Sequence, residues 1–385
     1  MKKLRVLVNV ETSRTYGRNI IRGISRYLAE NDHWLVHIED RGLQETQHWI
    51  EKWQGDGIIT RTSSYETAQI IADKKIPIVE LLGDGLGIIS EVPTDEKRLA
   101  EMAVEHFLEC QLRHFAFFAI GNAWWSNLRH KFFRETLLKH GFDLHVFPGF
   151  QDRIGGIYPE WDTHYDQLLP QWLADLPKPI GVWATSDFAA TRILDICHEI
   201  GIHVPEEIAL LGTTNDTLLC NLLTPPLSSI DTNSIKVGYT AAHLLDLKMS
   251  NASDIPETPI LIPPNGVVHR QSTDIMAVSD PDIADALQYI RNHACLGISV
   301  VEVAHHVGIS LSTLERRFQQ ILKRTPEKEI TRIRMQRGKK LLIESDLSVR
   351  NIATKLGFAT VEYFIQVFRK ETGMTPKQYR TNCKI

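Results

Sequence analysis

The sequence lacks any long apolar run. Of its 385 residues, 43% are hydrophobic and 23% are charged, an ordinary balance for a globular protein. No stretch approaches the roughly 18–20 apolar residues that a transmembrane helix needs. The short run 4–10 follows two lysines, as in a signal peptide, but Arg5 interrupts it, and Glu11 and Arg14 stand where a cleavage site would be. We therefore predict a cytoplasmic protein without membrane contact, and a first β-strand at 4–10.

Cysteine pairs and catalytic motifs are also lacking. The odd number and wide spacing of the cysteines predict reduced thiols and no zinc knuckle. The sequence has no P-loop, no GxGxxG and no GxSxG, and 198–203 (HEIGIH) differs from HExxH because its histidines are five residues apart. We predict neither an enzyme nor a bound cofactor or metal. The cysteines are Cys110, Cys197, Cys220, Cys295 and Cys383.

Charge is distributed unevenly along the chain. From Arg291 to the C-terminus there are 18 Lys and Arg against 8 Asp and Glu, whereas residues 1–290 hold 25 against 39. A formal charge of +10 on the tail and −14 on the body is typical of a nucleic-acid-binding domain joined to an acidic partner. The length also favours two or three domains over a single core.

The basic tail contains an internal repeat. The segment 301–310 reads VEVAHHVGIS and the segment 349–358 reads VRNIATKLGF, and the two match when Ala304 is aligned with Ala353. Small residues at equivalent positions allow helices to cross closely, and equivalent glycines suit the left-handed turn that ends a helix. The repeat therefore predicts two helix-turn-helix units. The equivalent pairs are Ala304 with Ala353, Gly308 with Gly357, Val303 with Ile352, and Val307 with Leu356.

An amphipathic helix follows each turn. The apolar positions recur at helical spacing: Leu311, Leu314, Phe318 and Ile321 in the first, and Val361, Phe364, Ile365 and Phe368 in the second. The opposite faces carry groups that suit base edges in the major groove of double-stranded DNA: Ser312, Thr313, Arg316 and Gln320, then Thr360, Glu362, Tyr363 and Gln366. Arg316 is placed to pair with a guanine, whereas Arg317, Arg369 and Lys370 are better placed for phosphates.

The two units are joined by the segment 326–344. Pro326 suits a helix start, and five cations between Arg332 and Lys340 give the helix a basic flank. We expect it to hold the two recognition helices at a fixed separation, with core residues Ile330, Ile333, Leu341 and Leu342.

The run 347–380 carries an I-A-x-x-x-G-F turn, a Y-F-x-x-x-F-(K/R)-K helix and a G-x-T-P-x-x-Y-R ending. In these motifs, residues 284–380 resemble the DNA-binding domains of the AraC/XylS family. The resemblance implies two recognition helices in successive major grooves on one side of the duplex. Gly338 departs from the pattern, at about 1 kcal/mol relative to alanine. The alternative is a helical bundle whose basic face is merely solvated.

The body alternates apolar runs with amphipathic stretches. This order predicts parallel, doubly wound α/β sheets, in which ligands bind at the carboxyl ends of the strands. The predicted strands are 5–10, 34–39, 57–60, 76–82, 114–120, 180–184 and 208–212, and the predicted helices include 18–29, 96–109, 129–140 and 188–200.

The segments 92–120, 183–194 and 209–230 resemble effector domains of the LacI/GalR family, which share the periplasmic sugar-binding-protein fold. The resemblance implies two lobes, one near 4–112 with a return at 232–258, the other near 113–230 with the final strand. We predict an effector-binding and dimerisation domain at 1–275, a linker near 272–282 and a DNA-binding domain at 283–385. This combination resembles the xylose operon regulators.

The resemblance also implies an effector site. Arg129 matches an arginine that contacts sugar hydroxyls, and its fork of donors suits vicinal oxygens. Asp187, Ser186 and Asn215 lie in matching segments, and the loop 11–16, with Glu11, follows the first strand. Asp187 could equally cap a helix, and Arg129 could be an exposed cation. Thr214 stands where the xylose regulators have an aspartate, so either the effector differs or another group substitutes for that aspartate.

Together these features predict a regulator in which a small sugar, a pentose such as xylose, shifts the population of closed lobes. A two-fold homodimer and contact with RNA polymerase are expected, with activation favoured and repression left open. Two alternatives remain: a sugar-binding protein with a basic tail, and a constitutive DNA-binding protein whose effector cleft is vestigial. The sequence does not give the sugar or the operator.

Overall fold

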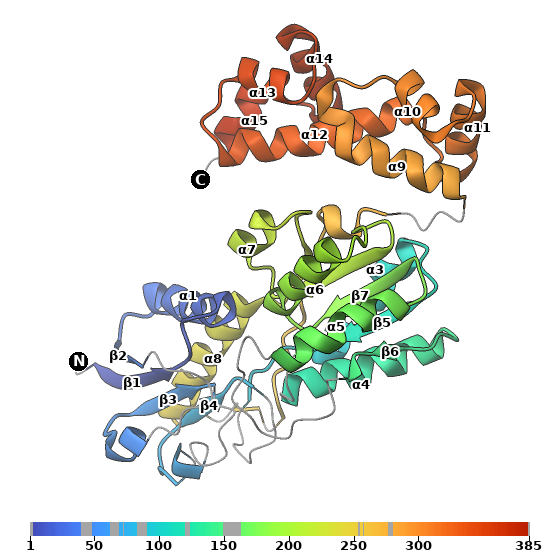
Figure 1. Cartoon of the computed structure of the whole chain (residues 1–385). Coiled ribbons are helices and arrows are strands. Elements are labelled where there is room, and N and C mark those ends of the chain that lie inside the picture. The colour runs from blue at the N-terminus through green and yellow to red at the C-terminus, as the bar shows by residue number, and fades with distance from the viewer. Residues whose placement is uncertain are drawn as a thin grey trace. The chain divides into compact units, whose positions relative to one another are not determined.

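The chain divides into two compact units, residues 1–275 and 276–385 (Figure 1). The computed structural model describes residues 3–39, 48–61, 69–71, 73–82, 91–119, 124–148, 163–252, 255–256, 258–275 and 280–383. Within these ranges, no helix has both the length and the apolar character needed to span a membrane.

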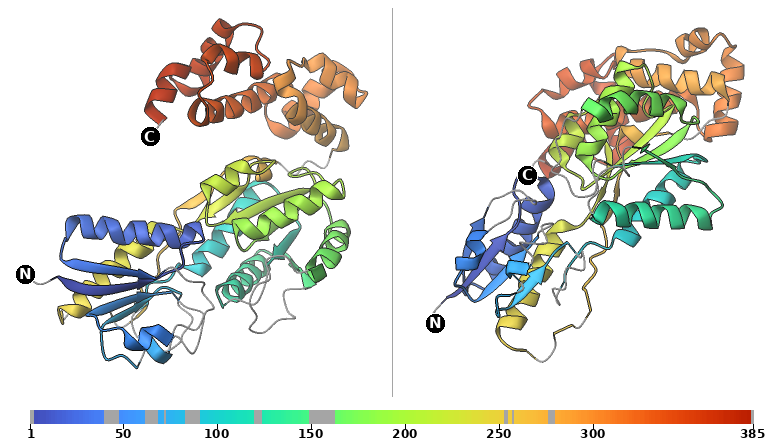
Figure 2. Two further views of the ribbon diagram at one scale, coloured as in Figure 1. Left: turned by 60° about the vertical axis from the view of Figure 1, so that its left-hand side comes forward. Right: turned by 60° about the horizontal axis from the view of Figure 1, so that its bottom comes forward.

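The first lobe of unit 1 is a parallel four-stranded sheet in the order β2-β1-β3-β4. Helices α1 and α8, blue and yellow in Figure 2, pack together on one of its faces. They approach closely because a Cβ on Gly23 or Gly238 would lie 2.0 Å from a backbone oxygen of the other helix. The elements are β1 (Leu4–Asn9), β2 (Trp34–Glu39), β3 (Gly57–Thr60), β4 (Ile78–Glu80), α1 (Thr15–Glu30) and α8 (Ser234–Met249).

The second lobe has six strands in the order β10-β9-β8-β7-β5-β6, and only β10 runs antiparallel to its neighbour. The strands are β5 (Phe115–Phe118), β6 (His145–Val146), β7 (Ile180–Ala184), β8 (Ile208–Thr213), β9 (Ser228–Asp231) and β10 (Gly266–Val268). The helices are α3 (Glu96–Glu109), α4 (Trp124–Lys139), α5 (Thr163–Asp175), α6 (Asp187–Glu199) and α7 (Thr217–Leu222). The predicted α/β class and parallel sheets are confirmed.

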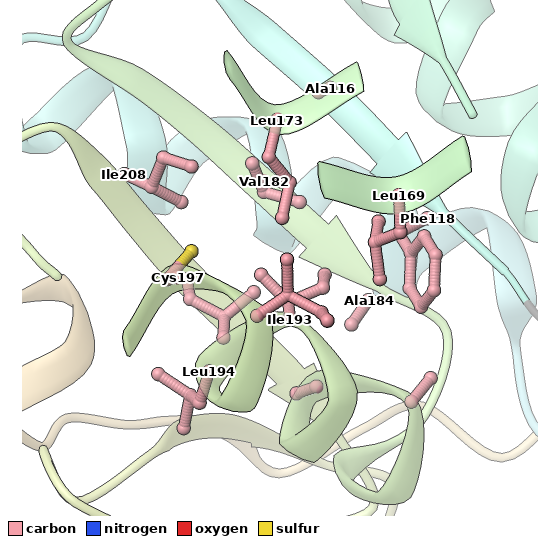
Figure 3. Packing of buried hydrophobic residues seen from close by; sticks show 14 of the residues in the cluster. Ala116, Phe118, Leu169, Leu173, Val182, Ala184, Ile193, Leu194, Cys197 and Ile208 are labelled. Carbon is pink, nitrogen blue, oxygen red and sulfur yellow. The ribbon is translucent and has the colours of Figure 1, made fainter. Parts of the chain in front are cut away.

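Alternation along the strands of this lobe builds a core on each face. Phe115 and Phe117 of β5 contact Phe107 of α3 and Phe133 of α4. Their neighbours Ala116 and Phe118 belong to the opposite core. Figure 3 shows that core, in which Leu169 and Leu173 of α5 and Ile193 of α6 gather around Val182 and Ala184 of β7.

Several predicted boundaries are wrong. The first lobe does not extend to residue 112, because α3 packs on α4 and on the second sheet. The linker does not begin at Ser272, which is fully buried in the effector unit, nor reach residue 282, because Asp280 caps the next helix. Helix α4 begins at Trp124, so Arg129 lies in its second turn. The strands β6 and β9 were not predicted, because one has two residues and the other begins with two serines.

Unit 2 is helical throughout its described part. Its helices are α9 (Pro281–His293), α10 (Val300–Val307), α11 (Leu311–Leu322), α12 (Pro326–Glu344), α13 (Val349–Lys355), α14 (Val361–Thr372) and α15 (Pro376–Cys383). Hydroxyl caps begin the helices of both repeats, with Ser299 before α10 and Ser348 before α13. Gly308 and Gly357 adopt the left-handed conformation in the turns, as the repeat predicts.

Helix α12 connects the two repeats by entering both cores. Ile330 and Ile333 pack in the first core, and Met335 and Leu342 pack in the second. Gly338 is buried on this helix, and a Cβ there would lie 3.0 Å from Leu356 Cδ1. A methyl group at this position would therefore require Leu356 to shift by a few tenths of an ångström. Because one helix serves both cores, the two repeats form one body.

Candidate functional site

The candidate effector site lies at the carboxyl ends of the parallel strands in unit 1. The loop after β1 belongs to the first lobe and the loop after β8 to the second. Thr15 Oγ1, in the first residue of α1 directly after the former loop, donates to Asp216 Oδ2 in the latter at 2.5 Å. The guanidinium of Arg14 lies 4.3 Å from the ring centre of Phe188 on α6. The two lobes thus meet at the edge where the sequence predicts ligand contacts.

Arg129 is buried there, with 7% of its side chain exposed. Its Nε and one terminal nitrogen donate to the two carboxylate oxygens of Glu96, at 2.6 and 3.1 Å. The other terminal nitrogen donates to the Thr185 carbonyl at 2.5 Å, and the indole of Trp125 lies 4.6 Å beneath the guanidinium. A guanidinium has five N–H donors, so two remain after these bonds. The alternative that Arg129 is an exposed cation is wrong.

Glu11 and Arg61 form a second buried pair. Arg61 donates to Glu11 Oε1 at 3.0 Å, and the two side chains are 10% and 5% exposed. Arg61 also lies 4.8 Å from the ring centre of Tyr16, whose hydroxyl is 2.9 Å from Thr94 Oγ1. Burial acts to lower the pKa of Arg61, but Glu11 and Tyr16 outweigh it and raise the pKa. The acidic partner thus offsets the effect of burial on the Arg61 guanidinium.

Asp187 is 2% exposed at the first turn of α6. One carboxylate oxygen accepts from Ser229 Oγ at 2.5 Å and the other from the Asp216 amide at 2.7 Å. Burial raises the pKa of Asp187 to about 7, while these two hydrogen bonds act to lower it. The cap of α6 is Ser186, whose hydroxyl accepts from the Ala189 amide. Both side chains thus have structural roles, and effector contact by either stays a prediction.

Asn215 lies in the loop after β8, and both Thr214 and Asn215 have positive φ. Its amide oxygen accepts from Arg270 at 2.8 Å. Arg270 also donates to Asn221 and to the Leu227 carbonyl, and it immediately precedes the 3-10 turn η3 (Gln271–Thr273). This loop is therefore linked by hydrogen bonds to the last described segment of unit 1.

The predicted recognition residues of the first repeat lie on α11. Ser312 and Arg316 are exposed, while Leu314 and Phe318 are buried beneath them. Arg316 contacts Gln320 at 3.3 Å on the same helix face. Thr313 is half-buried, and its hydroxyl is 2.8 Å from the capping hydroxyl of Ser310.

Arg317 differs from its neighbours. It donates to Asp282 at 2.7 Å and approaches Asp280 at 3.3 Å. These carboxylates begin α9, so the guanidinium connects α11 to that helix. A phosphate contact by Arg317 stays a prediction, and these two acids compete with it.

In the second repeat, the predicted residues on α14 form an exposed face. Glu362, Gln366 and Arg369 are exposed. Tyr363 is 52% exposed and packs edge-on against Phe358. Thr360 is exposed but is the N-cap of α14, because its hydroxyl accepts from the Tyr363 amide. Sequence reasoning placed these residues on one face without seeing the role of Thr360 as a cap.

Three residues with polar contacts at the effector site were not predicted: Arg61, Glu96 and Arg270. Arg61 directly follows the predicted strand 57–60, so the rule that ligands meet strand carboxyl ends would have found it. The other two have no such signal, because their partners are distant in the sequence. Tyr16 ends the predicted loop 11–16, and its hydroxyl contacts Thr94.

Comparison with known proteins agrees with this architecture. The XylR N-terminal domain matches residues 3–90, the periplasmic binding protein-like domain matches 104–273, and a helix-turn-helix domain matches 303–382. The xylose operon regulatory protein of Escherichia coli K12 is 32% identical over 98% of this chain and 97% of its own. The chain belongs to the xylose operon regulator family.

The family's Haemophilus influenzae regulatory protein is 33% identical over 99% of this chain and 98% of its own length. A solved structure, described as the xylose-binding transcription activator XylR, is 31% identical, covers all of both chains and superposes with a TM-score of 0.80. The predicted family and fold class are thus confirmed. As a member of the family, the chain is a DNA-binding transcription regulator with a sugar-type effector domain and an AraC-type DNA-binding domain.

Proposed function

We propose that this regulator activates a carbohydrate operon in the cytoplasm in response to a pentose, with xylose as the first candidate. Residues 1–275 bind the effector and dimerise, and residues 283–385 bind DNA. Xylose is supported by the two relatives, which are xylose operon regulatory proteins. Activation is supported by the similar solved structure, that of a xylose-binding transcription activator. Thr214 replaces the aspartate of the family pattern, so either the effector differs from xylose or another group of the site takes the place of that aspartate.

The observation that carries the effector proposal is the geometry of Arg129. Glu96 and the Thr185 carbonyl fix its guanidinium plane, and two N–H groups remain to bind vicinal sugar oxygens. Such preorganisation lowers the entropy lost on binding. The remaining proposed contacts, Glu11, Ser186, Asp187 and Asn215, come from the same strand ends.

Effector binding would reach the DNA-binding unit through Arg270. This side chain holds Asn215 at one end and is continuous with η3 at the other. Ser272 and Thr273 of η3 are buried. The Ser272 hydroxyl donates to the Leu210 carbonyl, and the Thr273 hydroxyl donates to Ser228 Oγ. A sugar that moves Asn215 would therefore change the restraints on η3, which precedes the segment that leads to the DNA-binding unit. The effector site and the DNA-binding unit would then be coupled through Arg270 and η3.

On DNA, α11 and α14 would bind base edges in the major groove. We propose base contacts by Ser312, Thr313 and Arg316 of α11 and by Thr360, Glu362, Tyr363 and Gln366 of α14. Arg369 and Arg317 would contact phosphates, which supply affinity rather than sequence discrimination.

A homodimer is supported by an apolar pair on α7. Leu218 and Leu222 are 82% and 80% exposed and lie one turn apart, and clustered exposed leucines are typical of interfaces. We expect the double variant Leu218→Glu, Leu222→Glu to sediment as a monomer. Leu138→Glu, at a 57% exposed leucine of α4, should leave the dimer intact. If the α7 double variant sedimented as a dimer, like the α4 control, α7 would not be the dimer interface.

DNA binding by the full-length protein tests the whole proposal. The DNA would be the promoter region flanking its own gene, at two salt concentrations, with and without D-xylose, L-arabinose and D-ribose. Transcription by added RNA polymerase would then show the sign of regulation. Specific binding that one sugar changes supports the proposal. Specific binding that no sugar changes favours a constitutive DNA-binding protein, and nonspecific, salt-sensitive binding alone contradicts both.

A further inference from the structure

The turn glycines of the two repeats have different surroundings, although they hold equivalent positions. Gly308 and Gly357 both adopt the left-handed conformation, with φ of 77° and 72°. A Cβ on Gly308 would meet no other part of the described chain within 4 Å. A Cβ on Gly357 would lie 2.5 Å from the Gly297 nitrogen and 2.8 Å from the Cys295 oxygen. The second turn therefore packs against the 3-10 turn η4 (Ala294–Leu296) and the glycine after it, which precede α10 of the first repeat.

Arg334 of α12 also connects the two repeats. It is one of the cations that the sequence placed on a basic flank, but it is only 9% exposed. Its Nε donates to the Ala294 carbonyl at 2.7 Å, and a terminal nitrogen approaches the Ile298 carbonyl at 3.4 Å. Its guanidinium carbon lies 5.3 Å from the ring centre of Phe358, which directly follows the turn glycine of the second repeat. Because a cation over an aromatic ring is attracted to it, Arg334 holds segments of both repeats.

Together these contacts form an inter-repeat joint, made of Cys295, Gly297, Arg334, Gly357 and Phe358. Helices packed on a shared helix such as α12 can still shift about it. The contact between Gly297 and Gly357 is made by segments outside α12, and Cys295 also packs against the second core. The joint therefore opposes rotation of one repeat against the other. Phe358 in turn packs edge-on against Tyr363 of α14, with 5.9 Å between the ring centres, so the joint reaches a predicted base contact.

We propose that the inter-repeat joint fixes the spacing of α11 and α14, so that the regulator binds tightly only to DNA whose two contacted segments are a fixed number of base pairs apart. Arg334 is a positioning residue, which acts on Tyr363 through Phe358. This inference rests on the proposed base contacts of α11 and α14 and adds a spacing requirement to them. One inserted base pair moves the second segment by about 3.4 Å and turns it by about 35°, which a rigid pair of helices does not follow.

Operators of altered spacing test this requirement. Footprinting of the full-length protein on the promoter region that flanks its own gene first locates the two neighbouring protected segments. Affinity is then measured for this operator and for operators with one base pair inserted or deleted between the segments. D-xylose, L-arabinose, D-ribose or no sugar is used, whichever gives the tightest binding. We expect the unaltered protein to bind both altered operators at least about tenfold more weakly, since one recognition helix loses its base contacts.

Substitution of Arg334 tests its positioning role. Arg334→Met keeps an apolar stem of similar length but removes the contacts to both repeats, and it should reduce the spacing penalty at least about threefold. Lys328→Met removes an exposed cation from the same helix, so it should keep the full penalty even where it weakens DNA binding as a whole.

The two turn glycines give a matched test of the contact itself. Gly357→Ala and Gly308→Ala impose similar backbone strain, because both glycines have positive φ. Only the methyl group of Gly357→Ala would reach Gly297. We expect Gly357→Ala to reduce the spacing penalty, as Arg334→Met does, and Gly308→Ala to leave it unchanged. The penalty is a ratio of two affinities measured on one preparation, so it does not depend on the folded fraction of a variant.

The outcomes separate the joint from the proposed base contacts. Equal affinity of the unaltered protein for all spacings, or an undiminished penalty in Arg334→Met, overturns the joint as the determinant of spacing. Equal effects of Gly357→Ala and Gly308→Ala on the penalty overturn it as well. If the unaltered protein binds the promoter region no more tightly than unrelated DNA of the same length, the proposed base contacts themselves are wrong.

Discussion

Arginine is used in two opposite ways in the two units of this regulator. In the effector unit, Arg61 and Arg129 are nearly buried and each is held by a glutamate. In the DNA-binding unit, Arg316 and Arg369 are exposed on recognition helices, and neither has an acidic partner within 280–383. A buried, paired guanidinium presents its donors in a fixed geometry, and salt screens its interactions little. Salt strongly weakens the attraction between an exposed guanidinium and a polyanion such as DNA.

The two kinds of arginine would contribute to binding in different ways, to effector affinity in the first unit and to DNA affinity in the second. The buried pairs have already lost their water and their rotational freedom, so a ligand that they bind would gain from their fixed geometry. The exposed arginines would lose both only on contact with DNA, and their contribution would depend on released counterions. Substituting arginines of each kind should separate the two modes.

The largest effect is expected for Arg129→Ala, which removes one of the two buried, paired arginines. Glu96 would be left as a buried carboxylate without its cation, so the unfolding free energy should fall by about 3–5 kcal/mol. Effector affinity should fall by at least about 100-fold, because the preorganised donors are lost. Chemical denaturation and calorimetric titration measure the two changes.

The control is Arg98→Ala, which removes an exposed arginine of α3 paired with Glu105. It should lower the unfolding free energy by only about 0–1 kcal/mol. Equal destabilisation by the two substitutions would contradict the distinction between buried and exposed arginines.

A smaller but more selective effect is expected for Arg316→Ala on α11. Loss of a bidentate base contact should weaken operator binding by about 1–3 kcal/mol and relax preference at one base pair. Competition binding with operators substituted one pair at a time measures both. Gln319→Ala, at an exposed neighbour on the same helix, should change neither; uniform weakening across all operators would make Arg316 a phosphate contact instead.

Arg270 differs from both kinds: it is part-buried, and within the described residues its side chain donates to neutral groups. We expect Arg270→Met to retain DNA binding and to reduce the change that the effector produces in it by about tenfold, the usual size of a coupling between sites. The measurement is the ratio of operator affinities with and without the effector. An unchanged ratio would show that the signal does not pass through Asn215 and η3.

The smallest effect is expected for Arg369→Ala near the end of α14. Operator binding should weaken alike for all sequences, and the slope of log affinity against log salt should fall in magnitude by about one, since one phosphate contact is lost. Affinities across a salt series give the slope. A change in sequence preference, with the slope unaltered, would assign Arg369 to a base.

The sequence by itself determined the DNA-binding unit almost completely. The repeat fixed the turns at Gly308 and Gly357, and helical spacing fixed the buried faces of α11 and α14, because both signals act between residues a few positions apart. The same local signals gave the alternating body and the strand ends after which Arg61 and Asp187 follow. No pattern among neighbouring residues showed where the chain passes from one lobe to the other, or that the short strands β6 and β9 would form.

Only the tertiary structure decided how the charged groups are used. Glu96 and Arg129, Glu11 and Arg61, and Asn215 and Arg270 are each more than 30 residues apart. Nothing in the sequence distinguishes a buried, paired arginine from an exposed one. That difference arises when the sheets bring distant strand ends to one edge and remove water from them, so burial and pairing, rather than residue type, set what each arginine can bind.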